Sequence, residues 1–430
     1  MDLKKEIKFS DLLPKRKPRQ EQPEVEETEV APKAKKKPFW KADLSFKRKP
    51  KAEVAEDAEP KQEKRKRAPR EKAPKRAKKL VGLKIGGSQL AAARVVNNGS
   101  PELVQVARED LDHGMVVGGE LREPELLADQ LRSFFRKHKL PRQGVRLGIA
   151  NNRIGVRIFE IAGIDDPKQL ENAIRFRAQE VLPIPIEDAV LDFQVLGDRI
   201  DDEGNKVRRI LLVVAYRELI DRYVTACKKA GLRLTGIDLE AFALLRALAG
   251  KGEDDEPSSG DAAVVVVAIG HDRSTFAVSD GRVCEFTRVL DWGGGTLDVA
   301  IARELDAAPS EVEPFKRELS LAVDNVPEGL TPEQATAARE AVRRQLSGFA
   351  RELVSSLQFY QNQPGSLGIG EIVITGGTAH LQGLADELQK LIGVRVRVGD
   401  PLSRVKLSKK LKETEQVGSL AVAIGLGIED

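Results

Sequence analysis

Three glycine-rich turns, each directly after a short apolar strand, constrain the fold of this chain more than any other sequence feature. The first is Val81-Gly-Leu-Lys-Ile-Gly-Gly-Ser88, the second is Gly270-His-Asp-Arg-Ser274 after the strand 263–269, and the third is Glu371-Ile-Val-Ile-Thr-Gly-Gly-Thr378. Because glycine has no side chain, such turns leave backbone N–H groups uncovered, and these groups can cradle a phosphate. The repetition predicts two similar halves that face a common cleft.

A fourth glycine run, Trp292-Gly-Gly-Gly-Thr296, stands before a segment with helical character. Glycines at a helix start can aim free N–H groups and the positive end of the helix dipole at a ligand. We therefore expect this helix to point its N-terminus into the same cleft.

Charge is distributed unevenly along the 430 residues, which are enough for at least two domains. Residues 1–80 contain 27 Lys or Arg and 15 Asp or Glu, a balance of +12, so the other 350 residues carry −8 of the net +4. Residues 1–79 have few large apolar side chains and cannot bury enough apolar surface to offset the entropy of ordering. We predict that they form a disordered basic tail.

Two apolar islands interrupt this tail, at residues 3–14 and 39–46. A repeated apolar island in a charged tail is typical of a short linear binding motif, of a weak anchor to an anionic membrane surface, or of a solvated spacer. The tail lacks the interleaved aromatic residues of a nucleic-acid binder, so no nucleic acid is expected as a partner.

The cysteines and the apolar runs bear on the compartment. Cys227 and Cys284 are far apart in the sequence, and neither they nor the four histidines have the spacing of a metal site or a disulfide framework. No apolar run approaches the ~18 residues of a transmembrane helix, and the N-terminus has no signal-peptide core. We expect a cytoplasmic protein that meets the cell membrane only peripherally, at its inner face.

Hydrophobic periodicity gives the coarse organisation. The helical patterns include 124–138, a segment from Pro167 with Leu170, Ile174 and Ala178 on one face, and 331–360 with Thr331 as its N-terminal cap. The predicted divisions are a tail (1–79), a first-lobe core (80–158), an inserted α+β subdomain (159–232), a return to the first lobe (233–250), a hinge linker (251–260) and a second lobe (261–430).

Two segments resemble a known family. Residues 173–195, in which a helix ends at the double-proline turn Leu182-Pro-Ile-Pro185 before the strand Leu191-Asp-Phe193, resemble the inserted subdomain of PilM, an actin-like protein of type IV pilus assembly that is itself similar to FtsA. Residues 372–378 and 394–401 resemble the adenosine-side motif of that family. The resemblance covers about residues 79–428. It implies an α/β fold of the actin-like (ribonuclease H-like) two-lobed ATPase type, with a small α+β subdomain inserted in the first lobe.

The family resemblance also implies a nucleotide between the lobes. The predicted cofactor is ATP, with the need for Mg²⁺ left open and no residue assigned to a metal. The positions that match the glycine turns, and that we predict to contact the nucleotide, are Lys84, Gly86, Gly87, Ser88, Gly270, Gly293, Gly294, Gly295, Gly376, Gly377 and Thr378.

Two positions depart from the family pattern. The phosphate loops of such ATPases carry an aspartate just before the Ile-Gly pair, which holds Mg²⁺. Here these positions hold Lys84 and Ala268, and the nearby carboxylate, Asp272, follows the glycine instead. A lysine cannot ligate Mg²⁺, but its ammonium can pair with a phosphate. We therefore predict a scaffold that binds ATP with little or no hydrolysis rather than an enzyme.

Three alternatives remain: a fold of this type that binds no nucleotide, an active ATPase, and an FtsA-like division protein. The last is disfavoured because FtsA-like chains usually end in an amphipathic membrane helix, which the segment Gly427-Ile-Glu-Asp430 does not resemble.

The partner that the resemblance implies is the cytoplasmic tail of a PilN-like membrane protein, docked on the inserted subdomain. The residues predicted to contact it are Ile174, Phe176, Leu182, Pro183, Ile184, Pro185 and Phe193. That tail carries an Asn-Leu-Leu-Pro-like motif, and Ser10-Asp-Leu-Leu-Pro14 loosely resembles it. As a hypothesis, this island can occupy the same groove, within one chain or between two copies, which would give self-association.

Overall fold

The computed structural model describes residues 78–112, 114–181, 185–200, 204–249, 262–281, 283–363, 365–409, 411 and 417–429. The two apolar islands of the basic tail and the predicted linker 251–260 lie outside these residues. The elements described below all belong to one compact unit, which begins at Lys72.

The first lobe is built on a sheet with the strand order β10-β6-β1-β2-β3-β16. Strands β1, β2 and β3 form an antiparallel meander. Strand β6 pairs in parallel with β1, and β10 pairs in parallel with β6. The strands are β1 (Lys78–Ile85), β2 (Gln89–Asn98), β3 (Ser100–Asp110), β6 (Gln143–Ile149), β10 (Arg233–Leu239) and the short β16 (Lys406–Leu407).

The second lobe repeats this arrangement in the order β13-β12-β11-β14-β15. Here too an antiparallel meander, β11 to β13, is extended by two parallel strands on the side of its first strand. The strands are β11 (Ala262–Ile269), β12 (Ser274–Ser279), β13 (Cys284–Leu290), β14 (Gly368–Thr375) and β15 (Val396–Val398). The matching strand orders confirm the prediction of two similar halves.

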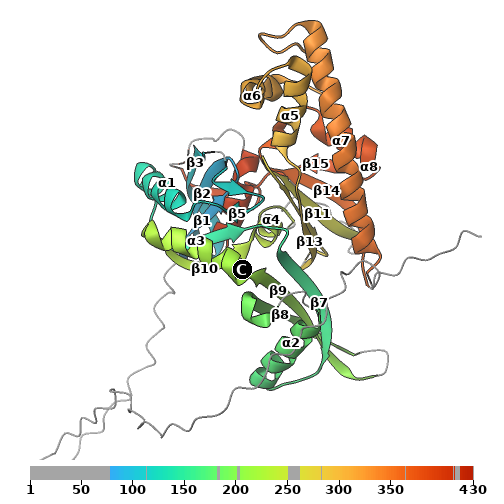
Figure 1. Ribbon diagram of the computed structural model, residues 1–430. Helices are drawn as coiled ribbons and strands as arrows, with labels where there is room; N and C mark the ends of the chain where they lie inside the picture. The colour runs from blue at the N-terminus through green and yellow to red at the C-terminus, as the bar shows by residue number, and fades with distance from the viewer. Residues whose placement is uncertain are drawn as a thin grey trace, which may run out of the picture. The chain divides into compact units, whose positions relative to one another are not determined.

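Helices pack on these sheets with their apolar faces buried. In the first lobe, α1 (Pro124–Lys137) buries Leu127, Leu131 and Phe134. In the second lobe, the elements are α5 (Gly294–Leu305), α6 (Pro309–Glu318), α7 (Pro332–Gln361) and α8 (Leu384–Ile392), labelled in Figure 1. Thr331 caps α7 as predicted, because its side chain accepts a hydrogen bond from Gln334 N while its own N–H donates to Gln334 Oε1.

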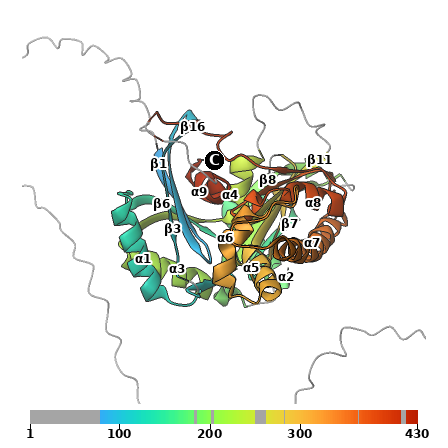
Figure 2. The same cartoon turned by 90° about the horizontal axis from the view of Figure 1, so that it is seen from above.

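Two short helices, α4 (Glu240–Leu248) and α9 (Ala421–Gly427), lie between the two sheets. Figure 2 shows both of them in the middle of the described structure, beside the blue strands of the first sheet. Their apolar side chains share one core cluster with Val266 and Ala268 of β11 and Val373 of β14, while α9 also packs on Ala93 and Val95 of β2. The elements β16 and α9 therefore pack with the first sheet, although the sequence placed all of 261–430 in the second lobe.

The small subdomain is a three-stranded antiparallel sheet, β7-β9-β8, with one helix on its face. Its elements are β7 (Ile154–Ala162), α2 (Pro167–Val181), β8 (Ala189–Ile200) and β9 (Lys206–Tyr216). The predicted face of Leu170, Ile174 and Ala178 is buried against this sheet. The predicted boundary at residue 159 falls inside β7, and α3 (Arg217–Lys229), predicted as part of the subdomain, packs in the first-lobe core through Tyr223 and Cys227.

Short elements complete the described structure. The hairpin β4 (Val116–Val117) and β5 (Glu120–Leu121) turns through two glycines with positive φ, which only glycine adopts readily. The 3₁₀ turns are η2 (Ile186–Asp188), η3 (Thr378–His380) and η4 (Val417–Leu420). This hairpin, β16 and α6 were not predicted from the sequence.

The packing of α9 on α4 depends on Gly425, because a Cβ atom at this position would stand 1.8 Å from Ala243 O. We predict that Gly425→Ala lowers the free energy of unfolding by about 1–3 kcal/mol through this overpacking. The matched control is Gly348→Ala in α7, where a Cβ atom would meet only the end of the Arg351 side chain, at 3.8 Å. This control should be neutral or stabilise the protein by up to about 1 kcal/mol. Urea unfolding measures both, and equal effects would contradict the packing argument.

Candidate functional site

A cavity of about 410 Å³ lies where the glycine turns of the two lobes meet. Its volume is in the range of small-molecule sites. The predicted contact residues on its wall are Lys84, Gly86, Gly87, Ser88, Gly270, Gly294, Gly377 and Thr378. The structure thus brings together residues that are almost 300 positions apart in the sequence.

The other predicted glycines, Gly293, Gly295 and Gly376, are not among the residues that line this cavity. Each allows close packing behind the wall instead. A Cβ atom at Gly376, where φ is +95°, would lie 2.3 Å from Ile269 O, and one at Gly293 would lie 2.5 Å from His271 O. These glycines let the ends of β14 and α5 abut the β11–β12 turn.

The N-terminus of α5 differs from the expectation of free N–H groups. Gly294 N donates to Gly270 O at 2.8 Å, and Gly295 N donates to His271 O at 2.8 Å. Thr378 Oγ1 also donates to Gly270 O, at 3.0 Å. The expectation was wrong for these two donors, because the carbonyl groups of the neighbouring turn already accept their hydrogen bonds.

Four charged side chains alternate in sign along the wall between the two lobes. Lys84 Nζ lies 4.0 Å from Glu240 Oε2, and Glu240 Oε1 lies 3.7 Å from Arg273 Nη2. Arg273 Nη1 lies 3.3 Å from Asp272 Oδ2. We call this set, Lys84–Glu240–Arg273–Asp272, the charge chain. Its first and second members come from β1 and α4, and its third and fourth come from the β11–β12 turn.

Glu240 and Arg273 are the buried centre of the charge chain, with 2% and 5% of their surfaces exposed. Burial disfavours the charged form of Arg273, but the carboxylates of Glu240 and Asp272 hold its pKa above the usual value. Neither residue was predicted from the sequence. A signal was present, since Glu240 is an acidic residue at the junction between a strand and an apolar helix.

The opposite wall of the cavity is formed by α6, which places Glu313, Lys316 and Arg317 there. Lys316 Nζ lies 2.6 Å from the buried Asp298 Oδ1 and donates to Gly294 O at 3.2 Å. Arg317 pairs with Glu313 at 2.7 Å on the exposed side of the helix. Cationic groups therefore stand on both walls.

The described residues offer poor ligands for a metal ion. Within them, no group of three or more His, Cys, Asp or Glu side chains could hold a metal. The two carboxylates of the charge chain each lie beside a buried arginine, and Ala268, which also lines the cavity, offers no ligand atom. The arrangement supplies positive charge through side chains rather than through a metal-binding carboxylate cluster.

A second hollow, which we call the groove, has a volume of about 710 Å³. It lies between the small subdomain and the first-lobe elements α1 and α3. The guanidinium group of Arg153 stands 4.0 Å from the centre of the Tyr216 ring. Arg217 donates to Ala189 O, at the start of β8, at 2.8 Å. The lining residues are Pro124, Arg153, Pro185, Asp188, Tyr216, Arg217, Glu218, Asp221, Arg222 and Thr225.

The residues predicted to contact a partner lie in different surroundings. Pro185 lines the groove, and Phe176 is 66% exposed on α2. Ile174 is 2% exposed in the subdomain core and forms no open surface, whereas Phe193 is partly buried against the same core. Leu182, Pro183 and Ile184 lie outside the described residues.

A family model decides how these features are to be classified. The model described as "Type IV pilus assembly protein PilM" matches residues 82–430. The chain belongs to the PilM family. The predicted resemblance is thereby confirmed, and with it the actin-like two-lobed fold.

Individual relatives agree with this membership. A solved "PilM-PilN type IV pilus biogenesis complex" has a TM-score of 0.68 and 26% sequence identity, covering 82% of this chain and 98% of that chain. The cell division protein FtsA of Escherichia coli (strain K12) is 25% identical over 377 residues, covering 78% of this chain and 87% of its own length. FtsA of Bacillus subtilis (strain 168) is 24% identical over 291 residues, covering 59% and 62%. In the part of this chain that the structure describes, no helix is long and apolar enough to cross a membrane.

Removing the central carboxylate of the charge chain tests its contribution to stability. We predict that Glu240→Ala lowers the free energy of unfolding by about 3–5 kcal/mol, because it leaves the buried Arg273 short of a counter-charge. Glu313→Ala is the control, since its pair with Arg317 is more than half exposed. It should cost at most about 1 kcal/mol. Chemical unfolding of both variants measures these changes. Similar losses of unfolding free energy in the two variants would contradict the prediction that the buried charge chain stabilises the fold more than an exposed ion pair.

Proposed function

We propose that this PilM-family chain is a cytoplasmic assembly scaffold of a type IV pilus machine, which holds ATP with little or no hydrolysis and binds the cytoplasmic segment of a PilN-like membrane protein. The single observation that carries the nucleotide part is the charge chain in the cavity between the glycine turns. The partner segment would place the protein at the inner face of the cell membrane.

The cavity suits the phosphates of ATP because it joins a glycine turn to cationic side chains. Gly86, Gly87 and Ser88 form a tight turn on one wall, and Lys84 stands directly before this turn. Charge-assisted hydrogen bonds from ammonium or guanidinium groups to phosphate are about twice as strong as neutral ones. Lys84 would therefore act as a stand-in for the metal ion, and Lys316 would supply positive charge from α6.

Slow or absent hydrolysis follows from the same residues. Efficient hydrolysis needs a group that places a metal ion and a group that activates water. Lys84 and Ala268 stand where the family pattern has metal-binding aspartates, and the carboxylate of Glu240 is held between Lys84 and Arg273. The residues present do not fit Mg²⁺, so our proposal includes no metal-dependent step.

The groove is the proposed docking site for the PilN-like segment. It is a hollow between the first lobe and the small subdomain, lined in part by Pro185, and a solved complex with this fold contains a PilM and a PilN chain. Its walls join the rings of Pro124, Pro185 and Tyr216 to charged groups, which suits a short peptide with apolar and polar side chains. Self-association and contact of residues 1–79 with anionic lipid remain predictions.

Nucleotide binding by the full-length chain tests the metal-independent site. We predict that the Kd for ATP is nearly the same in Mg²⁺ and in EDTA, with no phosphate release above background. Lys84→Ala should weaken binding about tenfold. Lys79→Ala, which removes an exposed lysine from the same strand, should not change it. Isothermal titration and a phosphate assay give the result, and Mg²⁺-dependent ATP hydrolysis by the wild type would contradict it.

Filling the groove tests the partner site. Thr225 is exposed on α3 and lines the groove, so Thr225→Trp should weaken binding of the cytoplasmic PilN-like peptide by about tenfold or more, while Thr225→Ala should have little effect. Phe176→Ala, which removes an exposed ring from α2, shows in the same titration whether the peptide contacts that helix. If only Phe176→Ala weakens binding, docking occurs on α2 rather than in the groove.

A further inference from the structure

The carboxylate of Asp272 fills a cradle made by two turns of the opposite lobe. Its Oδ2 accepts a hydrogen bond from Gly118 N at 2.9 Å and lies 3.3 Å from Arg273 Nη1. A Cβ atom at Gly87 would stand 2.7 Å from Asp272 Cγ and within 2.9 Å of both carboxylate oxygens. The backbone of the first glycine turn is thus in close contact with an anion that belongs to the protein itself.

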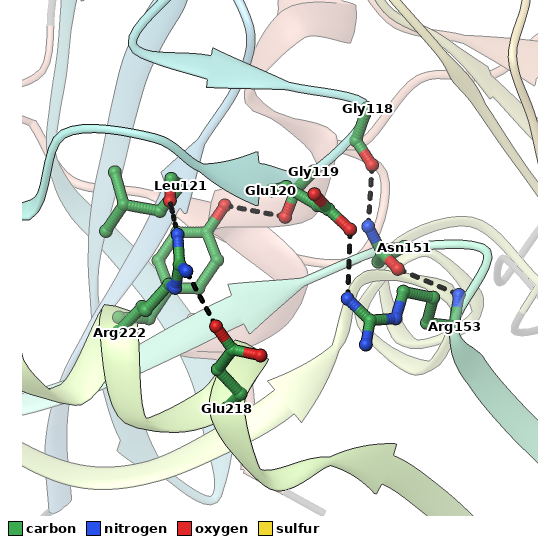
Figure 3. A network of polar contacts seen from close by, with 9 residues as sticks. Gly118, Gly119, Glu120, Leu121, Asn151, Arg153, Glu218 and Arg222 are labelled. Carbon is green, nitrogen blue, oxygen red and sulfur yellow. Dashed lines mark hydrogen bonds and ion pairs between the residues drawn. The ribbon is translucent and has the colours of Figure 1, made fainter.

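The donor at Gly118 is held in place from several sides. Asn151 Nδ2 donates to Gly118 O at 2.7 Å, as can be followed in Figure 3. The hydroxyl group of Tyr223 donates to Gly119 O at 3.1 Å. Two arginines complete the network, Arg153 at the carboxylate of Glu120 (3.1 Å) and Arg222 at the carbonyl of Leu121 (3.2 Å). The N–H group of Gly118 is therefore preorganised to bind an anion at the place that the Asp272 carboxylate occupies.

A phosphate in this cleft would lie among the groups that surround the Asp272 carboxylate. Gly87 and Asp272 both line the cavity, as do Arg273 and Lys84. A phosphate and a carboxylate are both negatively charged, so they repel each other at short range. The space beside Gly87 admits one of them at a time.

We propose that Asp272 is a built-in competitor for phosphate: a nucleotide engages the first glycine turn and Arg273 only when the Asp272 carboxylate has left Gly118 N–H. This inference rests on the proposed function of the cleft as a nucleotide site. Asp272 belongs to the second lobe and Gly118 to the first, so the contact also joins the two lobes. The apparent affinity for nucleotide is then reduced by the fraction of molecules in which the contact is open.

The test compares four full-length proteins: wild type, Asp272→Ala, Asp272→Asn and Asp110→Asn. Asp110 is the matched control, because it places the same charge on the cavity wall at the end of β3. The probes are a fluorescent ATP analogue and inorganic tripolyphosphate. Asp272→Ala should lower both Kd values about tenfold beyond the charge-only effect of Asp110→Asn. Asp272→Asn, which keeps an acceptor for Gly118, should fall between them.

Hydrogen exchange of the Gly118 amide in ligand-free protein gives a second readout, and it should be faster in Asp272→Ala than in wild type. Equal or weaker nucleotide binding by Asp272→Ala, with binding by the wild type intact, overturns the competitor and leaves the proposed function standing. If none of the four proteins binds either probe saturably, the nucleotide part of the proposed function fails and this inference with it. If a melting curve shows that Asp272→Ala is unfolded, the Kd values of Asp272→Asn are compared with those of Asp110→Asn instead. Equal or weaker binding by Asp272→Asn then overturns the inference.

Discussion

The cleft of this protein depends on one buried carboxylate, that of Glu240. An ionised carboxylate that is 2% exposed is tolerated only with counter-charges beside it. Lys84 supplies one of these charges from β1 of the first lobe, and Arg273 supplies the other from the β11–β12 turn of the second. Arg273 in turn lies beside Asp272, which reaches Gly118. One desolvated charge thereby fixes side chains from both lobes on this wall of the cavity.

The close packing of α4 and α9 explains how that carboxylate is positioned. Glu240 is the first residue of α4, and the apolar side of α4 is held by α9 between two sheets of the same strand order. Gly425 permits this contact, because any side chain there would collide with the backbone of α4 at Ala243. The end of the described chain, which packs with the first sheet, therefore supports the site from behind. Stability and the geometry of the cleft are coupled through this pair of helices.

Much of the fold could be predicted because its signals are local. Apolar strands, glycine turns and the Thr331 cap are each encoded within a few residues, and the repeated strand-to-turn pattern indicated two halves. The charge chain could not be predicted, since Glu240 and Arg273 meet only through the packing of separate lobes. The same reason explains why free N–H groups were wrongly expected at the N-terminus of α5. The N–H groups of Gly294 and Gly295 donate to carbonyl groups of a turn that is distant in the sequence but adjacent in the fold. Alternation of side chains also does not say which sheet a strand joins, so the predicted boundary at residue 159 falls inside β7, a strand that belongs wholly to the small subdomain.

Our proposal that side-chain cations replace a metal ion at the phosphates can be tested by a crystal structure of the full-length protein with a non-hydrolysable ATP analogue and Mn²⁺. Anomalous scattering from manganese locates any bound metal without ambiguity. We expect a phosphate oxygen within hydrogen-bond distance of Lys84 Nζ and no anomalous peak in the cleft. A manganese peak between the phosphates and the carboxylates of Glu240 and Asp272, with Lys84 turned away, would contradict it.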